Sequence, residues 1–316
     1  MSLYRSVRAV TQATGDGAVD WAAVTEAAKS STDPGDLEVL AGERDGYAAD
    51  VKAARNRVRE VTEIEFDLPE QVEVQNRHHW LDANVATFER VMAPLEQKVG
   101  STPGVAQVVN TGSMAFALSF LSRHVLGQYD PLLLADSNEH ALYFVRPNIK
   151  DTAEKLDAPY DRFRRWIAFH EVTHAAEFGA APWLPDHLEA VMHDAVENLA
   201  AGDLDREAMT TLDTTMTAVE GYAELVMDRA FDDEYADLRR KLEARREGRG
   251  PVERLVRRFL GLSVKRRQYE RGKEFFDAVV DSRDMATAGQ VWESPEMLPT
   301  DAELENPETW IARVDR

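Results

Sequence analysis

The chain contains no cysteine among its 316 residues. Disulfide bonds and thiolate metal ligands are therefore excluded, and any metal site must use histidine, aspartate or glutamate. The sequence also lacks an apolar stretch of the roughly eighteen residues that a membrane-spanning helix needs, and no signal-peptide run follows its N-terminal arginines. We therefore expect a cytoplasmic protein with no membrane-spanning part.

Positive charge is scarce, because 37 lysines and arginines face 57 acidic residues, which gives a net charge of −20. Such a chain repels a phosphate backbone, so we expect no nucleic-acid partner. Most of the basic residues are arginine, and this pattern predicts a halophilic protein from a high-salt cytoplasm. Residues 239–273 are the exception, with 14 basic and 4 acidic side chains. They predict solvated helices on the acidic body, or alternatively a surface for an anionic ligand or partner.

Strand signal is also scarce, and apolar residues recur mostly at helical spacing. We expect a mainly α protein with a helical N-terminal region over 1–110 and a second region over 111–316, or one continuous domain. A buried apolar helix is predicted at 113–127. Strands are predicted at 132–135 and 142–145, as a small sheet or hairpin that Pro147 ends. Asp157 or Asp161 is expected to cap the helix that follows.

That following helix carries the most informative pattern of the chain. His170, Glu171 and His174 form an HExxH motif within Trp166–Phe178. Residues four apart lie on the same face of a helix, so both imidazoles can reach one zinc ion while Glu171 stays beside the open coordination position. The pattern predicts a metal-dependent hydrolase with Glu171 as the general base. The apolar neighbours predict that the helix is buried.

A third protein ligand must come from elsewhere in the chain. A third histidine six residues after His174 is excluded, because that position is Ala180. Glu177 lies close in sequence, but its place on the same helix favours a second-shell or surface role. His187 and His193 stay open as alternatives.

Glu220 is the better candidate for the third ligand, 46 residues after His174. Glu220, Glu224 and Asp228 recur every four residues on one predicted helix, over about 206–229. Gly221 beside the first of them permits close approach of another backbone. We predict that Glu220 completes a His, His, Glu site. Glu224 or Asp228 is expected to orient a ligating imidazole by contacting the ring and not the metal.

Several segments together resemble the zincin-like metallopeptidase type 2 family, whose members are also described as coenzyme F-420 biosynthesis-associated proteins. The resemblance covers most of residues 120–316 and is most specific where the HExxH and Glu-Gly-x-Ala stretches occur together. It implies a mainly helical zincin-like fold and a zinc site. The segments that carry it are 126–130, 145–149, 169–178, 182–184, 220–228, 261–269 and 299–314.

These observations predict a zinc metallopeptidase that cleaves a peptide or amide bond. Tyr222, Tyr269, Arg146 and His187 are candidates to stabilise the oxyanion or contact the substrate. The strand at 142–145 is expected to pair with an extended peptide substrate. The alternative function is a non-peptidase zincin protein associated with deazaflavin coenzyme metabolism, for which four protein ligands and no labile water would be expected.

Overall fold

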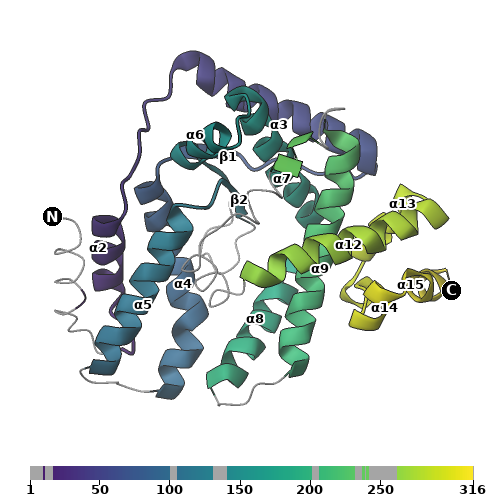
Figure 1. Ribbon diagram of the computed structural model, residues 1–316. Helices are drawn as coiled ribbons and strands as arrows, with labels where there is room; N and C mark the ends of the chain where they lie inside the picture. The colour runs from purple at the N-terminus through teal and green to yellow at the C-terminus, as the bar shows by residue number, and fades with distance from the viewer. Residues whose placement is uncertain are drawn as a thin grey trace. The chain divides into compact units, whose positions relative to one another are not determined.

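A computed structural model shows a mainly helical protein with one small sheet (Figure 1). It describes Val10 and residues 17–99, 105–130, 141–200, 206–231, 237–238, 240–241 and 262–315. The predicted fold class, mainly α with a small sheet before the HExxH helix, is confirmed. The elements are α2 (Trp21–Ser31), α3 (Ala41–Thr62), β1 (Gln71–Gln75), α4 (Arg77–Val99), α5 (Val105–Ser122), β2 (Gly127–Asp130), β3 (Ala141–Val145), α6 (Arg146–Lys155), α7 (Tyr160–Ala180), α8 (Leu184–Ala200), α9 (Arg206–Ala230), α12 (Leu262–Ser282), α13 (Met285–Gly289), η1 (Gln290–Trp292), η2 (Pro295–Met297), α14 (Asp301–Glu305) and α15 (Pro307–Val314).

The chain divides into two compact units, and each is built from several separate segments. Unit 1 takes Met1–Glu38, Gln71–Asp151 and Met192–Asp205. Unit 2 takes Val39–Glu70, Thr152–Val191 and Arg206–Arg316. Helix α3 belongs to the unit that contains the HExxH helix, so the segment before residue 110 contributes to both units.

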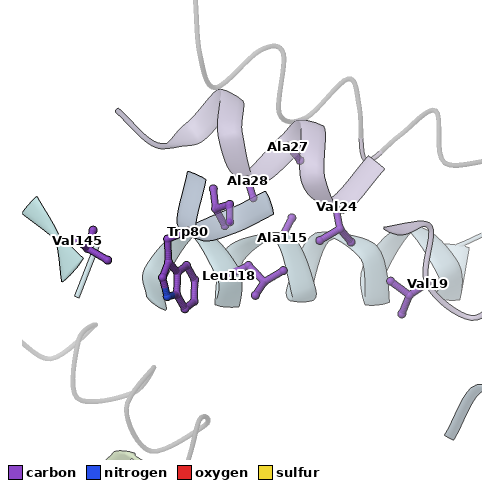
Figure 2. Close-up of a cluster of buried hydrophobic side chains, with 9 residues drawn as sticks. Val19, Val24, Ala27, Ala28, Trp80, Ala115, Leu118 and Val145 are labelled. Carbon is purple, nitrogen blue, oxygen red and sulfur yellow. The ribbon is translucent and has the colours of Figure 1, made fainter. Parts of the chain in front are cut away.

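The core of unit 1 forms where α2, α4, α5 and β3 meet (Figure 2). Val24 and Ala28 of α2 pack with Leu118 of α5, and all three are fully buried. Trp80 of α4 closes the same cluster, and its indole N–H donates to Gln128 of β2 at 2.7 Å. The apolar face of α5 is therefore used for packing within the unit rather than for a membrane. Among the described helices, none is both long and apolar enough to cross a bilayer.

The sheet has the strand order β1–β3–β2 and corrects one functional expectation. β3 confirms the strand predicted at 142–145, and it lies in the middle of the sheet. β1 pairs with it in parallel and β2 antiparallel, so both of its hydrogen-bonding edges are in use. The prediction that an extended substrate pairs with this strand is therefore wrong, because substrate backbone cannot add to a strand that has two neighbours. The strand predicted at 132–135 lies outside the described residues.

Two local predictions in unit 1 are corrected by the structure. The helix expected at 113–127 begins earlier, at Val105, and ends at Ser122. Asn148 accounts for the early end, because its side-chain amide donates to the carbonyl oxygens of Ser122 and Val125 and holds this segment as a turn. Within the N-terminal region that was expected to be helical, Gln71–Gln75 forms strand β1, which was not predicted.

Unit 2 is a helical assembly in which α7 packs against α3 and α9, while α12 lies across α9 (Figure 1). The α9–α12 crossing is very close at Gly221 and Gly272. A Cβ atom on Gly272 would collide with the carbonyl oxygen of Thr217, and one on Gly221 would collide with the Gly272 backbone. Glycine at both positions therefore lets the two backbones touch. Trp292 and Trp310 are buried in the same unit and hold the C-terminal segment there.

Candidate metal centre

Helix α7 brings the HExxH residues into the interior of unit 2. It is buried on nearly all sides, with Phe163, Ile167 and Val172 among its inaccessible side chains. A helix buried all round gains its stability from packing on several neighbours, which fixes its rotation about its own axis. The polar side chains that it carries are consequently held at fixed places in a low-dielectric interior.

The start of α7 differs from the prediction that Asp157 or Asp161 caps it. Pro159 occupies the N-cap position and provides no side-chain cap. Asp157 has a left-handed φ of 49° in the turn before the helix. Asp161 lies within the first turn, and its carboxylate accepts from Arg164 at 2.8 Å. An acidic residue in that first turn still stabilises the helix through its dipole.

His170, His174 and Glu220 come together as a group with one ligand atom each within 4.8 Å of the others. The two histidines lie one turn apart on α7, and their rings meet edge to face with centroids 4.8 Å apart. Glu220 approaches from α9 and is only 5% exposed. Its Oε2 atom lies 4.0 Å from Nε2 of His174. The structure thus places the predicted third ligand beside the two histidines.

Glu177 sets the orientation of His174. Its carboxylate is completely buried, and Oε2 lies 2.8 Å from Nδ1 of His174. Since an ionised carboxylate can only accept, Nδ1 donates, and the neutral imidazole then has its lone pair on Nε2, the atom that faces Glu220. This is the arrangement in which a metal-binding histidine usually occurs.

The electrostatics of the group are dominated by carboxylates in a buried place. Burial opposes the imidazolium, but Glu177, Glu220 and Glu171 outweigh it and raise the pKa of His174 above its ordinary value. Burial also raises the pKa of Glu177, against the attraction of His174. Glu171, the expected general base, is 7% exposed and is among the carboxylates that raise the pKa of His174. A concentration of negative charge next to two imidazoles is suited to a cation.

A family model described as a zincin-like metallopeptidase matches residues 19–205 and 195–311 of the chain. The chain belongs to this zincin-like metallopeptidase family. A crystal structure from Chloroflexus aurantiacus, described as that of a proposed hydrolase with a novel fold, is similar to it with a TM-score of 0.74 and 28% sequence identity. The match covers 99% of this chain and 98% of the other. Among curated proteins, none matches.

The donor set of this zincin-like chain fits a zinc ion. Two imidazoles and a carboxylate are ligands that zinc takes, and two donors on one tetrahedral zinc lie about 3.4 Å apart when each is about 2.1 Å from the metal. The separations of 4.0 Å and up to 4.8 Å therefore require the donor atoms to approach by about 0.6 Å and at most about 1.4 Å, within the reach of small side-chain rotations. Glu177 meets Nδ1 of His174, whereas Nε2 of the same ring faces Glu220.

The other two acids predicted on α9 differ from Glu220 in their surroundings. Glu224 is buried, at 6% exposure. Asp228 is exposed, and its carboxylate pairs with Lys273 of α12 at 2.7 Å. Among the contacts that the structure describes, the Glu177 carboxylate meets Nδ1 of His174, and the sequence had favoured a place for Glu177 behind a ligand or at the surface. Its three-residue spacing from His174 is the signal that could have assigned it, because such pairs are neighbours on a helix.

The four candidates for oxyanion or substrate contact have different places. Tyr222 is fully buried against Phe276 and Trp292, and burial, followed by the charge of Glu177, raises the pKa of its hydroxyl. His187 of α8 lies with Nε2 3.3 Å from the Thr215 hydroxyl, and burial lowers its pKa.

Arg146 belongs to unit 1, where it pairs with Asp36 at 3.3 Å. The side chain of Tyr269 lies outside the described residues. None of these four contacts His170, His174 or Glu220 in an interaction that the structure describes.

Proposed function

We propose that the protein is a zinc-dependent metallohydrolase that cleaves a peptide or amide bond. The observation that carries the proposal is the convergence of His170, His174 and Glu220 within 4.8 Å, with Glu171 next to His170 in the sequence of the same helix. Membership of the zincin-like metallopeptidase family supports a hydrolytic reaction, and the resemblance to a structure described as a proposed hydrolase agrees with it.

In this proposal the two imidazoles and Glu220 hold the zinc ion. A zinc ion in such a site lowers the pKa of a water molecule to roughly 7 and polarises a carbonyl group. Glu171 accepts the proton of the attacking water on its carboxylate and later donates it to the leaving amine. Glu177 keeps the proton of His174 on Nδ1, so that Nε2 stays available as a donor atom.

The ligand number favours catalysis over a purely structural metal. A structural zinc has four protein ligands, whereas a catalytic zinc has three and leaves one position for water or substrate. Within the described part of the chain, the possible ligand group has three members. Glu177, one candidate for a fourth ligand, meets Nδ1 of His174 instead.

The first experiment measures zinc in the purified protein by elemental mass spectrometry. We expect one zinc per chain in the wild type and substantial loss in Glu220→Ala. The matched control is His193→Ala, which removes an exposed side chain of α8 and should leave the zinc content unchanged. If wild-type protein takes up no zinc after repletion, the proposed function is wrong.

The second experiment separates metal binding from catalysis. Glu171→Gln should retain zinc but lower the rate of hydrolysis of a mixed peptide library by about 100-fold or more, because general-base catalysis contributes that much. The control is Glu189→Gln, which makes the same change at an exposed position of α8. Undiminished hydrolysis in Glu171→Gln would remove Glu171 from the role of base. A wild type that binds one zinc but cleaves nothing in the library would favour the non-peptidase alternative.

A further inference from the structure

The face of α7 that carries the two histidines also carries two aromatic rings, which form a continuous row with them. Phe163, Trp166, His170 and His174 follow one another at intervals of three or four residues. The rings of Phe163 and Trp166 are nearly parallel, at 9°, with centroids 5.8 Å apart. Trp166 and His170 are equally parallel, at 6° and 5.6 Å. The parallel rings therefore lead from Phe163 through Trp166 to the imidazole of His170 in the candidate metal centre.

The contact with Trp166 restricts how the imidazole of His170 can turn. Rotation of a histidine ring about its χ2 torsion is broad and only weakly restricted by the side chain itself. With its centroid 5.6 Å away, the indole favours an imidazole plane parallel to its own, because the parallel aromatic contact is lost when the imidazole turns. Trp166 is itself held in place, since it is 6% exposed and is backed by the fully buried Phe163.

Each histidine has a described contact that restrains its ring. His174 has the buried Glu177 carboxylate on its Nδ1 atom, which fixes the ring by a hydrogen bond. His170 has the parallel face of an indole, which fixes the plane of the ring by packing. A metal ion requires both donor atoms to point at one place, so an error in either plane weakens binding.

We propose that Trp166 is a positioning residue for the metal centre, which holds the imidazole plane of His170 in the orientation needed for a zinc ligand. This proposal rests on the proposed zinc site. It does not depend on the reaction, because it concerns metal affinity and not turnover.

The indole nitrogen provides a means to separate the flat face from the rest of the side chain. Nε1 of Trp166 is buried and makes no hydrogen bond to the part of the chain that the structure describes. Phenylalanine at this position therefore keeps the flat face and loses no described hydrogen bond. Leucine keeps an apolar side chain but removes the flat face.

The test measures zinc affinity of the full-length protein by competition with a chromophoric chelator. Trp166→Leu should bind zinc about ten-fold or more weakly, the lower end of what residues behind a metal ligand contribute, and Trp166→Phe should stay within about two-fold of wild type. Cobalt in place of zinc gives a second readout. The visible absorption of bound cobalt should change shape in Trp166→Leu and be restored in Trp166→Phe.

The control is Trp183→Leu. The Trp183 ring contacts His187, a histidine outside the ligand group, and its indole N–H donates to the carbonyl oxygen of Trp292. This variant should melt at lower temperature without losing zinc affinity. Equal loss of affinity in both leucine variants, or none in Trp166→Leu, would overturn the proposal while leaving the zinc site intact. Should Trp166→Leu fail to fold, Trp166→Met replaces it. A wild type that binds no zinc would instead refute the proposed function on which this inference rests.

Discussion

Removal of the Glu177 carboxylate should weaken zinc binding without touching a ligand. Glu177 is fully buried, and its Oε2 atom lies 2.8 Å from Nδ1 of His174. Its other oxygen makes no hydrogen bond to the described residues. The described hydrogen bonding of Glu177 is therefore directed at His174, so that a change in metal affinity can be traced to that one imidazole.

The size of the effect follows from this single hydrogen bond. A hydrogen bond to a charged group contributes about 1.5–3 kcal/mol, and loss of a residue behind a metal ligand lowers affinity about 10–100-fold. The two estimates agree, because a factor of ten corresponds to about 1.4 kcal/mol. We expect zinc to bind about 30-fold more weakly in Glu177→Ala. Glu177→Gln should lose less, about 5-fold, because the amide oxygen still accepts from Nδ1.

The loss should grow as the pH rises. Zinc requires His174 without its second proton, so protons and metal compete for Nε2. Despite burial, Glu177, Glu220 and Glu171 raise the pKa of His174, and this competition therefore persists to higher pH in the wild type. Without Glu177 that pKa falls. At about pH 6, protons compete less for Nε2 in the variant than in the wild type, which offsets part of the variant's loss of zinc affinity. At about pH 9, protons compete little in either protein, so the loss of zinc affinity is seen almost in full.

Zinc affinity should be measured by chelator competition across that pH range, with thermal melting of the metal-free proteins alongside. Glu189→Gln is the control, since Glu189 is exposed on α8. The reasoning would be refuted by wild-type affinity in Glu177→Ala at alkaline pH, or by a defect that is larger in acid than in alkali.

Two other substitutions test the packing and the ion pairs of unit 2. Gly272→Ala should lower the free energy of unfolding by about 1–3 kcal/mol and weaken zinc binding, because the new Cβ atom collides with the Thr217 carbonyl oxygen at the crossing beside Glu220. Chemical denaturation checks this, with Gly42→Ala as a control where a Cβ meets nothing within 4 Å. Glu303→Gln should reduce the melting temperature at neutral pH, and the reduction should become smaller in acid. Although burial opposes it, the hydrogen bonds from Arg313 and Thr300 hold the pKa of Glu303 below 4.5, so its stabilisation exists above that pH and is lost as the pH falls. An equal deficit at both pH values would contradict this.

The sequence predicted those parts of the protein that depend on short-range spacing. The four-residue interval between His170 and His174 requires only a helix to bring both imidazoles to one face, and α7 supplies it. The pairing of Glu220 with them was a longer extrapolation, suggested by a carboxylate beside a glycine, and the structure places that carboxylate 4.0 Å from His174.

The remaining errors concern long-range contacts and cap geometry. Strand β3 is recognisable from its residues, but its central place depends on Gln71–Gln75, about 70 positions away, and no local pattern encodes that partner. The stack of Trp166 on His170 was missed because apolar residues in a buried helix read simply as core. Asp157 looked like a cap from its chemistry alone, whereas the turn after α6 gives it a left-handed backbone instead.

The ligand group draws on two helices whose contributing residues are far apart along the chain. His174 and Glu220 are separated by 46 positions, and the whole of α8 lies between them. An ion bound by both would act as a crosslink, and closing a loop of that length removes about 4 kcal/mol of chain entropy from the unfolded state. Under the proposed function, the metal would therefore help to keep the chain folded as well as supply its chemistry. Protein made in metal-starved cells would then be the form most readily degraded by proteases.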